Sequence, residues 1–113
     1  MFSIQSPPVV ELPSFVIKVG DRLPGIEGFV AGAPGTLIPT ASLRFEFWNK
    51  KGGQRKGGAA YIFDGDLNGM RYDWQAGDTD LAGDYLGVWK TFDALGRQTS
   101  YPAEGHVFFR IED

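Results

Sequence analysis

The strongest constraint on the fold is a pair of apolar strands joined by a short acidic turn in the middle of the chain. Met70, Tyr72 and Trp74 alternate with polar residues before the turn, and Tyr85 ends the segment 80–85 that follows it. A Tyr at the start of a strand, directly after a tight corner, is typical of the tyrosine corner, in which the phenol hydroxyl bonds back to upstream backbone. The segment therefore predicts a β-sandwich.

Alternation of apolar and polar residues recurs along most of the chain, and helical periodicity is nearly absent. In 42–48, for example, Leu43, Phe45 and Phe47 share one face. Gly- and Pro-containing turns separate such runs, so we predict an all-β, antiparallel sandwich of seven to eight short strands. The expected strands are 15–19, 26–31, 42–48, 59–63, 70–74, 85–90 and 106–111. A last hairpin is expected to turn at 93–96, and a short run to Tyr101 follows it. The expected core comprises Leu43, Phe45, Phe47, Tyr72, Trp74, Tyr85, Trp89, Val107, Phe109 and Ile111.

Length, charge and composition limit the classes of protein that remain. The 113 residues fit a single domain, and 42% hydrophobic residues suffice for a packed core. The chain has no cysteine, which excludes disulfides and thiolate chemistry. A net charge of −3 does not favour nucleic-acid binding, and no apolar run approaches the roughly 20 residues that span a bilayer. We expect a soluble protein, made in a cytoplasm, that binds no specific nucleic acid and no membrane.

The first thirteen residues differ from the rest, because they contain three prolines and several isolated apolar residues. Proline cannot donate to a sheet ladder, and Pro-Pro favours an extended path. We therefore divide the chain into an extended N-terminal arm at 1–13 and a sandwich domain at 14–113. The segment is either a frayed terminus or an arm that contacts another subunit. In the second case its contact residues are Phe2, Ile4, Val9, Val10 and Leu12.

A basic cluster lies at the expected hairpin tip between residues 49 and 58. It comprises Lys50, Lys51, Arg55 and Lys56, with Trp48 at the base of the hairpin. Such a tip is commonly a solvated turn, but it also fits an acidic patch on a partner or a phosphate backbone. Exposed Trp is enriched at interface hot spots. We add these five residues to the candidate interface.

Residues that suit catalysis or metal binding are few. Asp78, Asp80 and Asp84 partly match the spacing of a calcium loop, but Asp84 already belongs to the next expected strand. We favour a structural role for these residues, in which turn carboxylates accept hydrogen bonds from backbone amides. His106, the only histidine, is expected to face outward beside Phe108. No nucleophile elbow, phosphate loop or dinucleotide motif occurs. We predict no catalytic residues, no metal and no cofactor, and hence no enzyme.

Four short motifs resemble one family. They are Val19-x-Asp21-x-x-Pro24, Gly35-x-x-Ile38-Pro39-x-Ala41, Tyr72-x-Trp74-x-x-Gly77-Asp78-Thr79 and Ala82-Gly83-x-Tyr85. Their order is similar to that of the Ig-like domain at the N-terminus of upper baseplate proteins of tailed phages, and of related domains in phage virion accessory proteins. The resemblance covers about residues 15 to 112 and implies an Ig-like sandwich in which the Tyr and Trp residues belong to the core.

The resemblance implies a non-enzymatic structural subunit of a tailed-phage virion, such as a decoration, connector or baseplate accessory protein. Such a subunit is made in the host cytoplasm, resides in the virion and docks on capsid, tail or baseplate proteins through its arm and a sheet edge or face. We expect a homo-oligomer or many copies on a symmetric assembly. The alternative is a carbohydrate- or host-surface-binding sandwich, which requires a row of exposed aromatic residues. A small hydrolase is disfavoured.

Overall fold

The computed structural model describes residues 12–30, 42–102 and 105–113, and these contain nine strands and no helix. The prediction of an all-β fold is confirmed. The first five strands are β1 (Phe15–Lys18), β2 (Ile26–Phe29), β3 (Ser42–Asn49), β4 (Lys56–Ala59) and β5 (Tyr61–Asp64). The remaining four are β6 (Gly69–Tyr72), β7 (Gly83–Phe92), β8 (Gln98–Tyr101) and β9 (Val107–Glu112).

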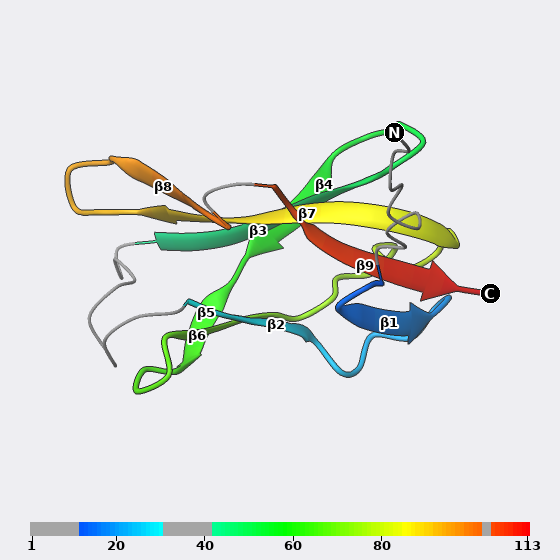
Figure 1. Ribbon diagram of the computed structural model, residues 1–113, viewed down its shortest axis with the longest axis horizontal. Helices are drawn as coiled ribbons and strands as arrows, with labels where there is room; N and C mark the ends of the chain where they lie inside the picture. Colours follow the sequence, from blue (N-terminus) through cyan, green and yellow to red (C-terminus); the bar gives the residue numbers. More distant parts are fainter. Residues whose placement is uncertain (1–11, 31–41, 103–104) are drawn as a thin grey trace, which may run out of the picture.

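The strands form two layers, as expected for a sandwich (Figure 1). The large sheet has the order β1-β9-β7-β3-β4, and β8 also pairs with β7. The small sheet has the order β2-β6-β5. In Figure 1, β7 runs along the molecule, with the β7–β8 hairpin projecting at the left and the β3–β4 hairpin at the upper right. Edge positions fall to β1, β4 and β8 in the large sheet and to β2 and β5 in the small one.

The large sheet is mixed rather than purely antiparallel, which corrects one detail of the prediction. β1 pairs with β9 in parallel, with Phe15 opposite Phe109 and Ile17 opposite Ile111. Antiparallel direction is enforced only where a tight turn joins neighbouring strands. Because β1 and β9 lie at opposite ends of the described chain, no hairpin constrains their relative direction.

Two further differences raise the strand count to nine. Residues 98–101 form β8 on β7, although only polar residues precede Tyr101 in it. The strand expected at 59–63 is two strands instead, because the chain leaves the large sheet after Ala59 and enters the small one at Tyr61. Figure 1 shows this crossing between the layers. The amide of Ala60 still donates to Leu43 O at 2.9 Å, so the change of sheet occurs within one residue.

The core is aromatic and fills the space between the sheets. Nine of the ten expected core residues are buried, and Val107 is partly buried. Phe45 is at the centre, with its ring centroid 4.5 Å from that of Trp89 and 5.5 Å from that of Tyr72. Trp74 packs on both Phe47 and Phe109, which belong to the opposite sheet. These contacts join the two layers.

The tyrosine corner is present. The Tyr85 hydroxyl donates to Leu81 O at 2.7 Å, and the ring stacks on Phe109 in the core. The preceding turn is fastened by Asp78, whose Oδ2 accepts hydrogen bonds from Gln75 N at 2.8 Å and from the Tyr72 hydroxyl at 2.5 Å. The structural role assigned to Asp78 is therefore confirmed.

Candidate functional site

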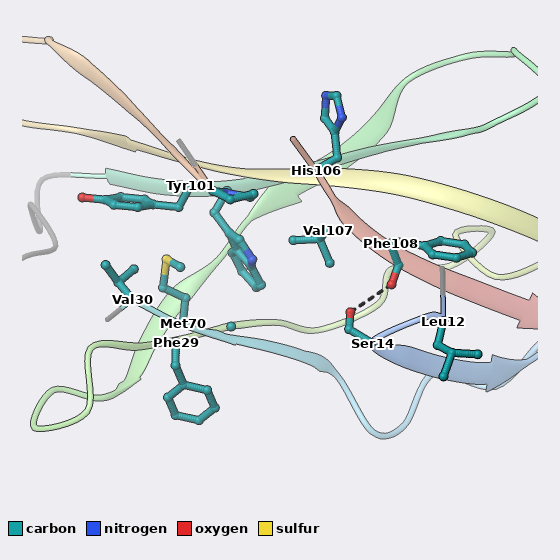
Figure 2. Close-up of a pocket in the computed structure, with 12 residues that line it drawn as sticks. Leu12, Ser14, Phe29, Val30, Met70, Tyr101, His106, Val107 and Phe108 are labelled. Carbon is teal, nitrogen blue, oxygen red and sulfur yellow. Dashed lines mark hydrogen bonds between the residues drawn. The ribbon is translucent and has the colours of Figure 1, made fainter. Parts of the chain in front are cut away.

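An apolar groove lies between the two sheets near the start of β9, with a volume of about 480 Å³ (Figure 2). Met70 of β6, Trp89 of β7 and Val107 of β9 supply much of its apolar lining. These strands are far apart in sequence, and the sandwich topology brings them together. An apolar groove of this size accommodates a side chain or a short segment of a partner.

Gly28 on β2 determines how closely the two sheets approach at this groove. A Cβ atom at Gly28 would lie 2.7 Å from Trp89 Nε1 and 3.0 Å from Trp89 Cε2, so any larger residue would collide with the indole. The absence of a side chain at Gly28 therefore allows Trp89 to pack directly against the β2 backbone and helps to shape the groove.

The N-terminal chain reaches the domain beside this groove. Both the amide and the hydroxyl of Ser14 donate to Phe108 O, at 2.8 and 2.9 Å, which attaches the chain to β9. Leu12, two residues earlier, borders the groove and is 78% exposed. An exposed leucine at the mouth of an apolar groove is available to a partner.

Trp48 lies on the outer face of the large sheet and is half-buried rather than free. The Arg55 guanidinium lies 4.2 Å from the centre of its ring, and the His106 ring meets it edge-on with centroids 5.1 Å apart. Arg55 also lies 3.7 Å from Glu46 Oε2, which in turn is 2.6 Å from Lys90 Nζ. Arg55 and His106 thus flank Trp48, and Arg55 connects it to the ion pair of Glu46 and Lys90.

The basic residues of the hairpin contact different parts of the domain and do not form one patch. Lys50 Nζ lies 4.8 Å above the Phe108 ring, and Lys56 Nζ donates to Gly77 O at 2.9 Å. Lys51 is exposed at the tip, where its backbone amide donates to Asn49 Oδ1 at 2.8 Å. Three of the four cations, Lys50, Arg55 and Lys56, are therefore engaged with their own domain.

The structure thus brings only part of the candidate interface together. Leu12 is at the groove, and Trp48 is held beneath Arg55 on the outer face. The arm residues Phe2, Ile4, Val9 and Val10 lie outside the described residues. His106 is exposed, as expected, but Phe108 beside it is buried beneath Lys50 and Arg110.

One exposed feature was not predicted from the sequence. Phe29 and Tyr61 on the outer face of the small sheet are 56% and 42% exposed. Both residues belong to expected strands, 26–31 and 59–63, but neither ring is predicted as a site from the sequence. Predicting this exposed feature would have required knowing that the three strands of the small sheet are neighbours, which a single sequence does not reveal.

The phenol of Tyr72 is held in its protonated form. Burial, followed by the hydrogen bond to Asp78, raises the pKa of Tyr72 well above its usual range.

Across 12–30, 42–102 and 105–113, no three His, Asp or Glu residues converge as metal ligands. No helix in these ranges is long and apolar enough to cross a membrane.

Comparison of the chain with protein-family models, with curated proteins and with solved structures found no match.

Proposed function

We propose that this chain is a non-enzymatic structural subunit of a tailed-phage virion, with an Ig-like sandwich that docks on other virion proteins. The main support is the apolar groove beside the N-terminal chain, with Leu12 exposed at its mouth. The four motifs that resemble phage baseplate and accessory domains supply the biological setting. The proposal includes several copies on a symmetric assembly, with residues 1–13 as the docking arm.

Docking of the arm depends on a balance between the entropy lost when it becomes ordered and the apolar area that it buries. Ordering a proline-rich arm costs about 1–2 kcal/mol per residue in backbone entropy. Burial of apolar side chains on a partner offsets this cost at about 25 cal/mol per Å². Leu12 continues the apolar series of the arm and lies at an apolar groove. One partner surface would therefore contact the arm and the groove together.

The proposal is tested by attachment to particles. Particles of the phage that encodes the chain are purified, and the chain is quantified in them by mass spectrometry. Particles from a deletion strain are then mixed with purified chain and sedimented. We expect Leu12→Asp to reduce cosedimentation at least tenfold. Leu95→Asp is the matched control, because Leu95 is also 78% exposed but lies on the β7–β8 hairpin.

Absence of the chain from wild-type particles would overturn the proposed function. Equal cosedimentation of the Leu12→Asp and Leu95→Asp variants would instead overturn the role of the groove. Each variant is first checked by thermal unfolding, because both replaced side chains are exposed and the fold should tolerate either change.

A further inference from the structure

The outer face of the small sheet carries an aromatic patch, which we define as Phe29, Tyr61, Phe63 and Arg71. In the first row across the strands, Phe29 of β2 lies opposite Gly69 of β6. On the other side Asp64 of β5 pairs with Gly69, and Phe63, at the register shift just before it, brings its ring over Gly69. Figure 2 shows the Phe29 ring pointing away from the groove, whereas Met70, the next residue after Gly69, lies on the groove side. Phe29 borders the groove, but its ring and the groove are thus on opposite sides of the small sheet.

Gly69 allows the two phenylalanine rings to meet above the sheet. A Cβ at Gly69 would lie 2.9 Å from Phe63 Cε1 and 3.1 Å from Phe29 Cε1, so both rings lean over the bare backbone. Their centroids are 5.5 Å apart in an edge-to-face arrangement. The result is a compact aromatic platform in which the two ring planes are 76° apart, so that one ring offers its face and the other its edge.

The second row places hydrogen-bonding groups beside the platform. The Arg71 guanidinium bonds to Glu27 Oε1 through two of its nitrogens and lies 4.6 Å from the centre of the Phe63 ring. The Tyr61 hydroxyl donates to Asp73 Oδ2 at 3.0 Å. Glu27 raises the pKa of Arg71, and Tyr61 contributes further, so the guanidinium stays charged. These polar groups are held in place by their mutual contacts.

We propose that the aromatic patch binds a neutral hexopyranose unit of an oligosaccharide. The C–H groups on one face of a sugar ring carry partial positive charge and pack on the negative face of an aromatic ring. Arg71, Glu27, Asp73 and the Tyr61 hydroxyl lie at the margin, where sugar hydroxyls would meet them as donors and acceptors. Both hydrogen-bond donors and acceptors are therefore present beside an exposed apolar platform.

Charge favours a neutral sugar over an acidic one. Arg71 is the cation of the patch, and its charge is already matched by Glu27, while Asp73 adds a further negative charge. An acidic sugar would meet this excess of carboxylate and would have to displace Glu27. A neutral sugar needs no such displacement.

The size of the patch favours a sugar over a second protein chain. A stable protein interface uses about 20–30 residues on each side. The small sheet has three strands of four residues each, and only alternate residues face outward. One or two sugar rings match this area better than a protein surface. The inference is independent of the virion function, because it concerns the opposite side of the small sheet.

The test is a titration of ¹⁵N-labelled protein with cellohexaose, maltohexaose and mannohexaose, followed by amide chemical shifts. We expect at least one of these sugars to shift the signals of β2, β5 and β6 selectively, with millimolar affinity. Phe29→Ala and Tyr61→Ala should each weaken the binding at least tenfold. Leu81→Ala is the matched control, since Leu81 is similarly exposed but lies in the turn before β7, and it should bind like the unmodified chain.

A second variant tests the platform without removing a ring. Gly69→Ala places a Cβ between Phe29 and Phe63 and should weaken binding while the spectrum remains dispersed. Three results would overturn the inference. They are no shift with any of the three sugars, stronger binding of an acidic hyaluronate hexasaccharide, and shifts of the patch that depend on protein concentration alone, which would indicate self-association.

Discussion

The outer faces of the two sheets use similar residues but present them differently. On the large sheet, the Trp48 ring lies under Arg55, and Phe108 is only 6% exposed beneath Lys50 and Arg110. On the small sheet, Phe29 remains largely exposed, although Arg71 lies close to its neighbour Phe63. Aromatic and cationic residues together thus do not define a binding surface.

The difference follows from which residues are neighbours in the sheet. On the large sheet, long cationic side chains come from the β3–β4 hairpin and β9, and they extend over the aromatic rings. Lys and Arg can cover apolar surface with their stems while their charged ends stay in water. On the small sheet, Gly69 occupies the position between Phe29 and Phe63, and Arg71 is directed towards Glu27. Exposure is therefore decided by register and not by composition.

The largest loss of stability is expected for a residue that packs against both sheets. Trp74 follows β6 and contacts aromatic rings of β1, β3 and β9, and its Nε1 donates to Pro24 O at 3.0 Å. Trp74→Ala should lower the free energy of unfolding by about 3–5 kcal/mol through lost burial and a cavity. Urea denaturation followed by circular dichroism measures this change.

If the two sheets were stabilised independently, Trp74→Ala would affect only the small sheet. Hydrogen exchange separates these outcomes, because amides of β3 and β9 report on the large sheet and amides of β6 on the small one. Loss of protection confined to β6 would contradict the role of Trp74 in joining the layers. Leu67→Ala is a suitable control, since Leu67 is exposed in the β5–β6 turn.

The second prediction compares the faces directly. Phe108→Ala removes a covered ring and should cost about 3 kcal/mol of unfolding free energy, near the lower end for a buried phenylalanine. Phe29→Ala removes a largely exposed ring and should cost about 1 kcal/mol or less. Chemical denaturation of both variants gives the difference. Equal costs would show that the two rings are equally important to stability and would remove the contrast between the faces.

Much of the fold was predictable because it depends on local patterns. The alternation in 42–48 marks β3 and its buried face correctly, and the segment 80–85 predicts the Tyr85 corner. The hairpin turn at 93–96 is confirmed between β7 and β8, but the strand bounds of β8 were not predicted, because β8 is an edge strand whose side chains are mostly polar. The crossing at Ala60 was missed because the Gly and Ala residues around it show no clear alternation.

Less of the candidate sites was predictable, since they depend on which strands are neighbours. Trp48 and the basic tip were identified as one cluster, but the structure directs Arg55, Lys50 and Lys56 to separate contacts. The aromatic patch requires that β2, β6 and β5 be adjacent in that order. Residues 29, 63 and 69 are each unremarkable in the sequence, and only strand pairing makes them one surface.

The smallest expected effect concerns the response of the large sheet to acid. The Lys90 ammonium of β7 forms an ion pair with Glu46 of β3. This contact, strengthened by the charges of Arg55 and Arg44, lowers the pKa of Glu46 below its ordinary value of 4.5. A carboxylate whose pKa is lower in the folded state stabilises the fold above the unfolded-state pKa. This contribution is lost as the pH falls through the folded-state pKa. Stability should therefore decline below about pH 4.5, partly through Glu46.

Glu46→Gln should make the free energy of unfolding less dependent on pH between about 4.5 and 3, because glutamine does not titrate. Denaturant titrations at several pH values measure this slope. The control is the Lys90→Gln background, in which Glu46 loses the partner chiefly responsible for its low pKa, so the further change Glu46→Gln should alter the slope much less. An unchanged slope in the single Glu46→Gln variant would show that the acid response arises from another group. The next group to replace is Asp93 on the β7–β8 hairpin, because hydrogen bonds from Arg97 also lower the pKa of Asp93. The network around Trp48 would then be a packing arrangement without a titrating component.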